Sequence, residues 1–134
     1  MTRLKILLWI VALTQLLLGI LTLFVPGPFF QAMGLTPPPP DNQYILGQLA
    51  ARFLAYGIGM AWLARSPAPS RFWIRNMVLI QAVDFSVGAF YLFTGTIALS
   101  TAAFPMFNAL WIGILLWLWQ PPARNIDNSA MQSV

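Results

Sequence analysis

Apolar residues are grouped in four long runs, which are separated by short polar or proline-containing segments. Each run has about 20 residues, the length that an α-helix needs to cross the hydrocarbon core of a bilayer. Polar residues within the runs are isolated, so the pattern indicates membrane-spanning helices rather than the amphipathic helices of a soluble domain. We predict helices over residues 4–25, 45–64, 72–93 and 98–119.

The connections between these runs differ in length. The first, residues 26–44, is a Pro-rich external loop in which four consecutive prolines, Pro37 to Pro40, favour polyproline II. The other two are short, so the second, third and fourth helices should be antiparallel neighbours. We therefore predict an all-α fold, in which residues 1–124 form a single antiparallel four-helix bundle. The polar tail, residues 125–134, is predicted to be disordered.

Composition supports a location in the membrane. Apolar residues make up 59% of the 134 residues and charged residues 7%, whereas ordinary globular proteins have about 45–50% and about 25%. A soluble chain of this size would leave large apolar patches exposed to water. We expect a multi-pass protein of the bacterial inner membrane or an equivalent membrane.

Two missing residue types exclude several kinds of chemistry. The sequence has no cysteine and no histidine. It therefore has no disulfide, thiol redox pair or cysteine nucleophile, and no metal or haem that is held by Cys or His. We predict no metal site.

The positive charges predict the orientation of the bundle. Cytoplasmic loops of membrane proteins retain Lys and Arg, and six of the seven cations lie in or within a few residues of the N-terminus, the connection between the second and third helices, or the tail. We therefore place both termini in the cytoplasm. The cations form no continuous patch, so nucleic acid is not an expected partner. They are Arg3, Lys5, Arg65, Arg71, Arg75 and Arg124.

Each predicted helix carries a polar residue at a similar depth. This residue lies twelve or thirteen positions from the residue that flanks the predicted cytoplasmic end of its helix, which is Arg3, Arg65, Arg71 or Gln120. The separation corresponds to about 18–20 Å at about 1.5 Å per residue. Two glutamines share helix faces with these residues. The predicted polar layer consists of Gln15, Gln48, Arg52, Gln81, Asp84 and Asn108.

A charge at this depth is costly, at roughly 2.5–3.5 kcal/mol. We therefore expect Arg52 and Asp84 to face inward and to pair with each other. A stripe of small residues on the second helix should allow a neighbouring helix to approach closely, which would make this helix the most enclosed. The stripe consists of Gly47, Ala51, Ala55 and Gly59.

Two interpretations of the polar layer remain open. In the first, Arg52 and Asp84 form a buried clamp that sets the register of the helices. In the second, they line a pocket that opens outward or sideways into lipid, where Arg52 holds the anionic or carbonyl group of a lipid-like or isoprenoid-like ligand. Neither interpretation assigns a catalytic residue.

The layout also resembles a known group of proteins. The second predicted helix is glycine-rich and has an arginine in its first half, the turn Arg65-Ser66-Pro67 follows, and the third helix is polar. This arrangement is similar to the small bacterial four-helix membrane proteins of the DoxX-like kind. The resemblance covers all four helices and implies the bundle fold without an assigned reaction. Small multidrug transporters match less well, since they rely on a glutamate in the first helix, where this chain has Gln15.

The function we favour is non-catalytic. The protein would be an accessory subunit of a larger membrane complex, or would bind a lipid-like ligand at the polar layer. Its expected partners are membrane lipid, other membrane protein subunits or a second copy of the chain. A membrane enzyme or a small transporter would have to use Asp84. Pairing with Arg52 favours the charged carboxylate, which suits an electrostatic anchor better than a proton donor.

Overall fold

The computed structural model describes residues 2–66 and 68–122. The described part is helical, as predicted, and the bounds of each predicted helix differ from those of the observed long helix by at most two residues. The predicted disordered tail, residues 125–134, lies outside the described residues. The elements are α1 (Thr2–Phe24), α2 (Pro26–Ala32), the 3₁₀-helix η1 (Pro40–Asn42), α3 (Gln43–Arg65), α4 (Arg71–Phe93) and α5 (Leu99–Trp119).

Three of the four long helices of the described chain, α1, α4 and α5, are long and apolar enough to cross a membrane. The fourth, α3, has 23 residues like α1 and α4, but it is not among the candidate spans. Gln43, Gln48 and Arg52 lie within it and lower its mean hydropathy. Length and composition therefore support three of the four predicted spans.

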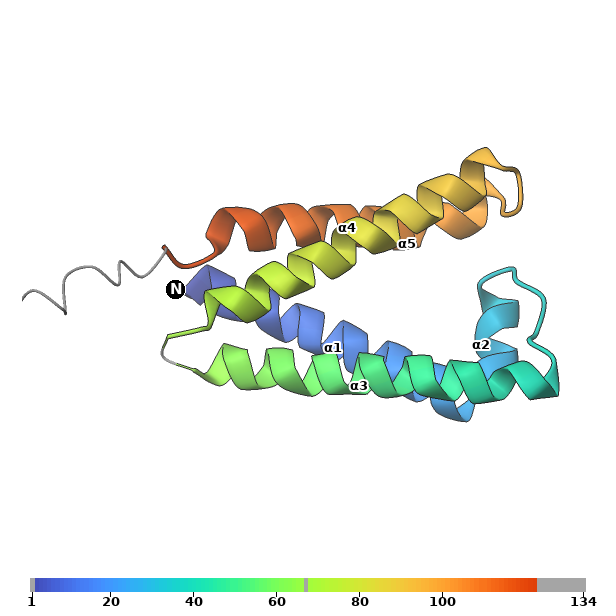
Figure 1. The fold of residues 1–134 in the computed structure, drawn as a ribbon, viewed down its shortest axis with the longest axis horizontal. Coiled ribbons are helices and arrows are strands. Elements are labelled where there is room, and N and C mark those ends of the chain that lie inside the picture. The colour runs from blue at the N-terminus through green and yellow to red at the C-terminus, as the bar shows by residue number, and fades with distance from the viewer. Residues whose placement is uncertain (1, 67, 123–134) are drawn as a thin grey trace, which may run out of the picture.

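The four long helices pack as two antiparallel hairpins (Figure 1). α1 lies along α3, and α4 lies along α5, whereas α1 and α5 make a smaller contact. The backbones of α3 and α4 lie further apart, and these two helices meet through side chains. The N-terminus, the connection 66–70 and the end of α5 lie together at one end of the molecule. We call this the basic end, because Arg3, Lys5 and three further arginines of the described chain belong to it.

Reciprocal glycine contacts hold the first hairpin together. Leu54 of α3 lies over Gly19 of α1, and Leu16 of α1 lies over Gly57 of α3. A Cβ atom at either glycine would come within 2.8 Å of the facing leucine side chain. Small residues let two backbones approach closely, and each leucine here occupies the space that a glycine leaves.

The second hairpin repeats this arrangement. Met106 of α5 lies over Gly88 of α4, where a Cβ atom would be 2.7 Å from the Cγ of Met106. Gly113 of α5 faces Gln81 of α4, with 3.3 Å between the two Cβ positions. All four of these close glycine contacts lie within a hairpin, so the sequence specifies each hairpin more tightly than the contact between them.

The small-residue stripe that the sequence predicted as a packing face is not one. Ala51 and Ala55 are exposed, and a Cβ atom at Gly59 would meet nothing within 4 Å. The face of α3 that packs against α1 contains Ala50, Leu54 and Gly57 instead, because the leucine fills the space beside Gly19. α3 is also not the most enclosed helix, since it has five buried residues and α1 has eight.

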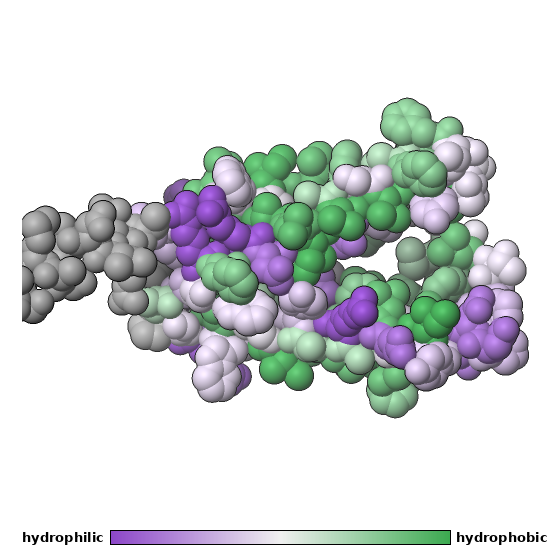
Figure 2. All heavy atoms as spheres, viewed as in Figure 1, coloured by the Kyte–Doolittle hydropathy of each residue, from purple (hydrophilic) through white to green (hydrophobic). Residues whose placement is uncertain are grey.

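The two hairpins share a hydrophobic core only near the basic end. The core residues come from the first half of α1, the second half of α3, the start of α4 and the second half of α5. Beyond this core the hairpins diverge, and the molecule is hollowed between them at the opposite end (Figure 2). The core consists of Leu4, Leu7, Leu8, Val11, Ala12, Met60, Leu63, Ala64, Ile74, Met77, Ile112 and Leu116.

The connection 26–44 contains the short helices α2 and η1, and Pro39 between them has dihedrals close to the polyproline II values that the run of prolines predicts (φ −53°, ψ 151°). α2 begins with Pro26, which suits a first helical position because its missing N–H would have no partner there. The helix is closed at Gly34, which has φ +75°, by a hydrogen bond from the Leu35 N–H to the Phe30 carbonyl. A Cβ at Gly34 would lie 3.4 Å from the Thr101 hydroxyl. The segment after α2 therefore reaches across the opening to α5.

Candidate functional site

The predicted polar layer lies at the level where the common core ends. On α4, Met77 and Gln81 are buried, with exposed fractions of 0% and 4%, whereas Asp84 on the next turn is exposed. On α3, Met60 is buried, Tyr56 is half-buried and Arg52 is exposed. Burying unpaired polar groups is costly, so the helices separate where such groups replace Leu, Ile and Met on the inner faces.

The structure does not bring Arg52 and Asp84 together as an inward-facing pair. Both residues are exposed, as is Gln48. Within the described chain, neither Arg52 nor Asp84 takes part in a side-chain hydrogen bond. The expected pairing is wrong for this structure because the two residues belong to different hairpins, which have already diverged at this level.

The other amides of the layer face the interior. Gln15 and Gln81 are buried, and the Nε2 of Gln81 donates to the Met77 sulfur at 3.6 Å. Gln15 takes part in none of the side-chain hydrogen bonds of the described residues, yet no fully buried polar side-chain atom there lacks a partner. Its amide must therefore reach accessible space. Asn108 is half-buried and accepts a hydrogen bond from Trp111 of its own helix at 3.3 Å.

A groove of about 400 Å³ begins at Arg52 and continues toward the basic end along the seam between α3 and α4. This volume is within the range of small-molecule sites, roughly 300–1,000 Å³. Gly59 leaves the groove wide, because nothing lies within 4 Å of its Cβ position. We call it the Arg52 groove, and it is lined by Arg52, Ala55, Tyr56, Gly59, Met60, Trp62, Leu63 and Trp73.

The polar groups of this groove are hydrogen-bond donors. Arg52 contributes a guanidinium, which has five donors and no acceptor. Tyr56, one helical turn away, accepts a hydrogen bond from the side-chain amide of Asn76 on α4 at 3.2 Å. This bond engages one lone pair of the Tyr56 oxygen and leaves the Tyr56 hydroxyl proton free to donate into the groove. A ligand that supplies acceptors matches this pattern.

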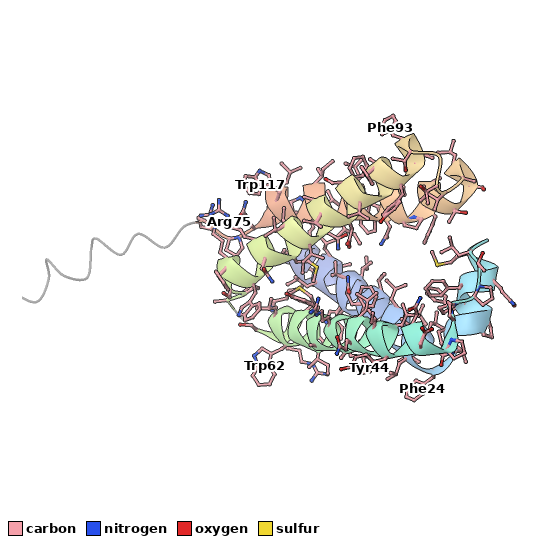
Figure 3. All side chains as sticks on the ribbon, turned by 45° about the vertical axis from the view of Figure 1, so that its right-hand side comes forward. Phe24, Tyr44, Trp62, Arg75, Phe93 and Trp117 are labelled. Atoms are coloured by element: carbon pink, nitrogen blue, oxygen red, sulfur yellow. The ribbon has the colours of Figure 1, made fainter. Side chains whose placement is uncertain are left out.

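Aromatic residues surround both ends of the helices (Figure 3). Trp62 and Trp117 point outward near the basic end, and Phe24, Tyr44 and Phe93 point outward near the other end. Aromatic belts of this kind occur at the two interfaces of a membrane. The part of the molecule between the two belts is therefore the part that the hydrocarbon of a membrane can surround.

Two contributors to the groove, Trp73 and Asn76, were missing from the predicted polar layer. Both residues lie near the start of α4, away from the predicted depth, and a tryptophan at such a helix end is typical of an interfacial anchor. Tyr56 shares the helix face of Arg52, so its position could be found from the spacing of four residues. The role of Asn76 could not be found from spacing, because its contact with Tyr56 depends on how α4 crosses α3.

Comparison with known proteins finds no relative of the chain: no protein-family model, no curated protein and no solved structure matches it.

Proposed function

We propose that the protein crosses the membrane four times, with the basic end in the cytoplasm. α3 runs along α1, which is itself long and apolar enough to cross, so a bilayer that contains α1 also surrounds α3. Five of the six cations of the described residues belong to the basic end, and Arg52 is the exception. Cytoplasmic retention of Lys and Arg therefore favours this orientation.

Reporter insertions test the orientation and the number of crossings. Alkaline phosphatase is active only outside the cytoplasm, so it should be active when inserted within 94–98 and inactive when inserted within 66–70. If α3 did not cross, the connections before and after it would be on the same side. Activity at 66–70 would then contradict the proposal.

We propose further that the protein is a non-catalytic binder of a lipid-like ligand, which it holds in the Arg52 groove. The observation that carries this proposal is the combination of two donors, Arg52 and Tyr56, with an apolar floor in one groove of ligand size. The expected ligand has an acceptor group, either a carboxylate or a carbonyl, joined to an apolar body. The acceptor would lie at Arg52, and the body would lie over Gly59 toward Trp62 and Trp73.

The energetics favour such a ligand. A guanidinium in the hydrocarbon region costs roughly 2.5–3.5 kcal/mol on insertion scales, and Arg52 has no side-chain hydrogen bond within the described chain to offset it. A hydrogen bond to a charged group contributes about 1.5–3 kcal/mol. An acceptor that binds Arg52 therefore recovers a large part of the cost, and apolar contacts along the groove add to it.

The groove favours binding over proton chemistry. None of its lining residues is a carboxylate, and Asp84 is not among them. The enzyme or transporter alternative needs Asp84 as its acid or base beside the ligand. A role as an accessory subunit would instead place a partner protein on the same surface, and the DoxX-like resemblance stays a prediction that is compatible with either role.

Native mass spectrometry of the protein purified in mild detergent tests the ligand proposal. The unchanged protein should retain a small molecule, and added oleate should replace it. Arg52→Ala should reduce retention at least about tenfold, which corresponds to the loss of one charge-assisted hydrogen bond. Gly59→Leu should reduce it as well, because the new side chain enters the groove without meeting other atoms near its Cβ.

Two control variants make the test specific. Arg3→Ala removes an exposed cation outside the groove, and Gly27→Leu adds the same bulk at a second glycine whose Cβ position is open. Both should retain the ligand like the unchanged protein. Equal binding of oleate by all variants would refute the groove as the site, and a copurifying protein in place of a small molecule would support the accessory-subunit alternative.

A further inference from the structure

Two arginines near the start of α4 are held in place by residues at the C-terminal end of α5. The Nε of Arg71 donates to the Oε1 of Gln120 at 3.1 Å. The guanidinium of Arg75 lies over the ring of Trp117, 5.3 Å from its centroid. Gln120 is itself fixed, because its Nε2 donates to the Trp117 carbonyl at 2.9 Å. Both arginines are therefore oriented by the last turn of α5 and the residue that follows it.

This arrangement keeps two positive charges close together. Arg71 and Arg75 are four residues apart on one helix, so they are neighbours on its surface, and like charges at this spacing destabilise a helix. The acids of the described chain lie elsewhere: Asp41 belongs to η1 at the opposite end, and Asp84 lies more than two turns further along α4. The described residues thus provide no carboxylate that would neutralise the pair.

We propose that Arg71 and Arg75 bind the phosphodiester head group of an anionic phospholipid at the basic end. Arg71 uses only its Nε for Gln120, which leaves its two terminal nitrogens to donate. Guanidinium groups match phosphate oxygens with paired hydrogen bonds. Arg75 lies over Trp117 and takes part in none of the side-chain hydrogen bonds of the described residues, so its donors are available for the same contact.

The surface beside this pair fits the acyl chains of such a lipid. Leu110, Ile114 and Trp117 of α5 are exposed and spaced by four and three residues, so they form one apolar stripe that leads away from Arg75 along the helix. An acyl chain on this stripe would place its head group at the two arginines. This site is on the second hairpin and is separate from the Arg52 groove.

Lipid titration followed by native mass spectrometry tests the proposal. The full protein is purified in detergent, and phosphatidylglycerol or phosphatidylcholine of the same chain length is added. We expect clear preference for phosphatidylglycerol. Each cation near an anionic lipid surface changes the binding constant about fivefold, so Arg71→Gln with Arg75→Gln should reduce the preference about thirtyfold. Arg75→Gln alone, which perturbs folding less, should reduce it about fivefold.

Matched controls separate this site from general attraction and from the Arg52 groove. Arg3→Gln with Lys5→Gln removes two charges from the same end and should leave the preference unchanged, as should Arg52→Ala. Equal loss in the Arg3 and Lys5 variant would overturn the site in favour of nonspecific attraction. Displacement of phosphatidylglycerol by millimolar inorganic phosphate would also overturn it, since the site would then bind a free anion.

Discussion

The packing of α3 against α1 can be tested with two glycines that lie two residues apart. Gly57 is buried against Leu16 of α1, whereas Gly59 faces the groove. A Cβ at Gly57 would lie 2.7 Å from the Leu16 Cγ and 3.0 Å from its backbone nitrogen, while a Cβ at Gly59 would meet nothing within 4 Å. The same substitution to alanine should therefore have opposite effects at the two positions.

The magnitude follows from two contributions. Replacing glycine by alanine within a helix stabilises it by about 0.5–1 kcal/mol, and this contribution applies equally to both positions. Overpacking costs about 1–3 kcal/mol and applies only to Gly57. We expect the upper half of that range, because the Leu16 backbone nitrogen cannot yield unless α1 moves. Gly59→Ala should be more stable than the unchanged protein, and Gly57→Ala should be less stable than Gly59→Ala by about 2–3 kcal/mol.

Reversible unfolding in mixed micelles of increasing dodecyl sulfate content, followed by tryptophan fluorescence, measures these free energies. A double-mutant cycle with Leu16→Ala identifies the cause: the cost of Gly57→Ala should be smaller when Leu16 is truncated. Equal stability of the two glycine variants would refute the close approach of α1 and α3. A cost at Gly57 that Leu16→Ala leaves unchanged would contradict the contact with the Leu16 side chain and would place the overpacking at its backbone nitrogen alone.

Two further experiments address the contact between the hairpins. Tyr56→Phe removes the hydrogen bond from α4 and should lower the free energy of unfolding by about 0.5–1.5 kcal/mol. The control, Tyr44→Phe, changes a side chain that is 73% exposed and should alter stability by less than about 0.5 kcal/mol. Equal effects of the two changes would argue against the bond. Because the chain has no cysteine, single cysteines report accessibility without interference. Asp84→Cys should react with N-ethylmaleimide in the folded protein and Met77→Cys should react only after denaturation, and equal rates would show that the hairpins do not diverge between these positions.

The helices themselves could be predicted from the sequence. Their bounds follow from the length of the apolar runs and from the residues that end them, which are local properties. The location of the cations at one end also follows, since the antiparallel order of the helices brings Arg65 and Arg71 next to the N-terminus. The helix α2 could not be predicted from the sequence, because its short apolar segment resembles an irregular loop.

The faces of the helices were harder to predict. The stripe of Gly47, Ala51, Ala55 and Gly59 has the same spacing as a packing face, and only the position of α1 shows that Gly57 is the glycine in contact. Which face of α3 packs depends on which side chain of α1 fills the space beside each glycine. The sequence of one helix alone does not contain this information.

The sequence also predicts that polar residues lie at one level in all four helices, because the level depends only on counting along each helix. Whether they meet was decided by tertiary structure. A core of leucine, isoleucine and methionine side chains joins the hairpins near the basic end, and it stops where Arg52 and Asp84 would have to be buried. The hairpins separate there, since apolar packing is favourable only up to that level. Arg52, which the sequence placed in a buried pair with Asp84, therefore lies on α3 at the start of a groove.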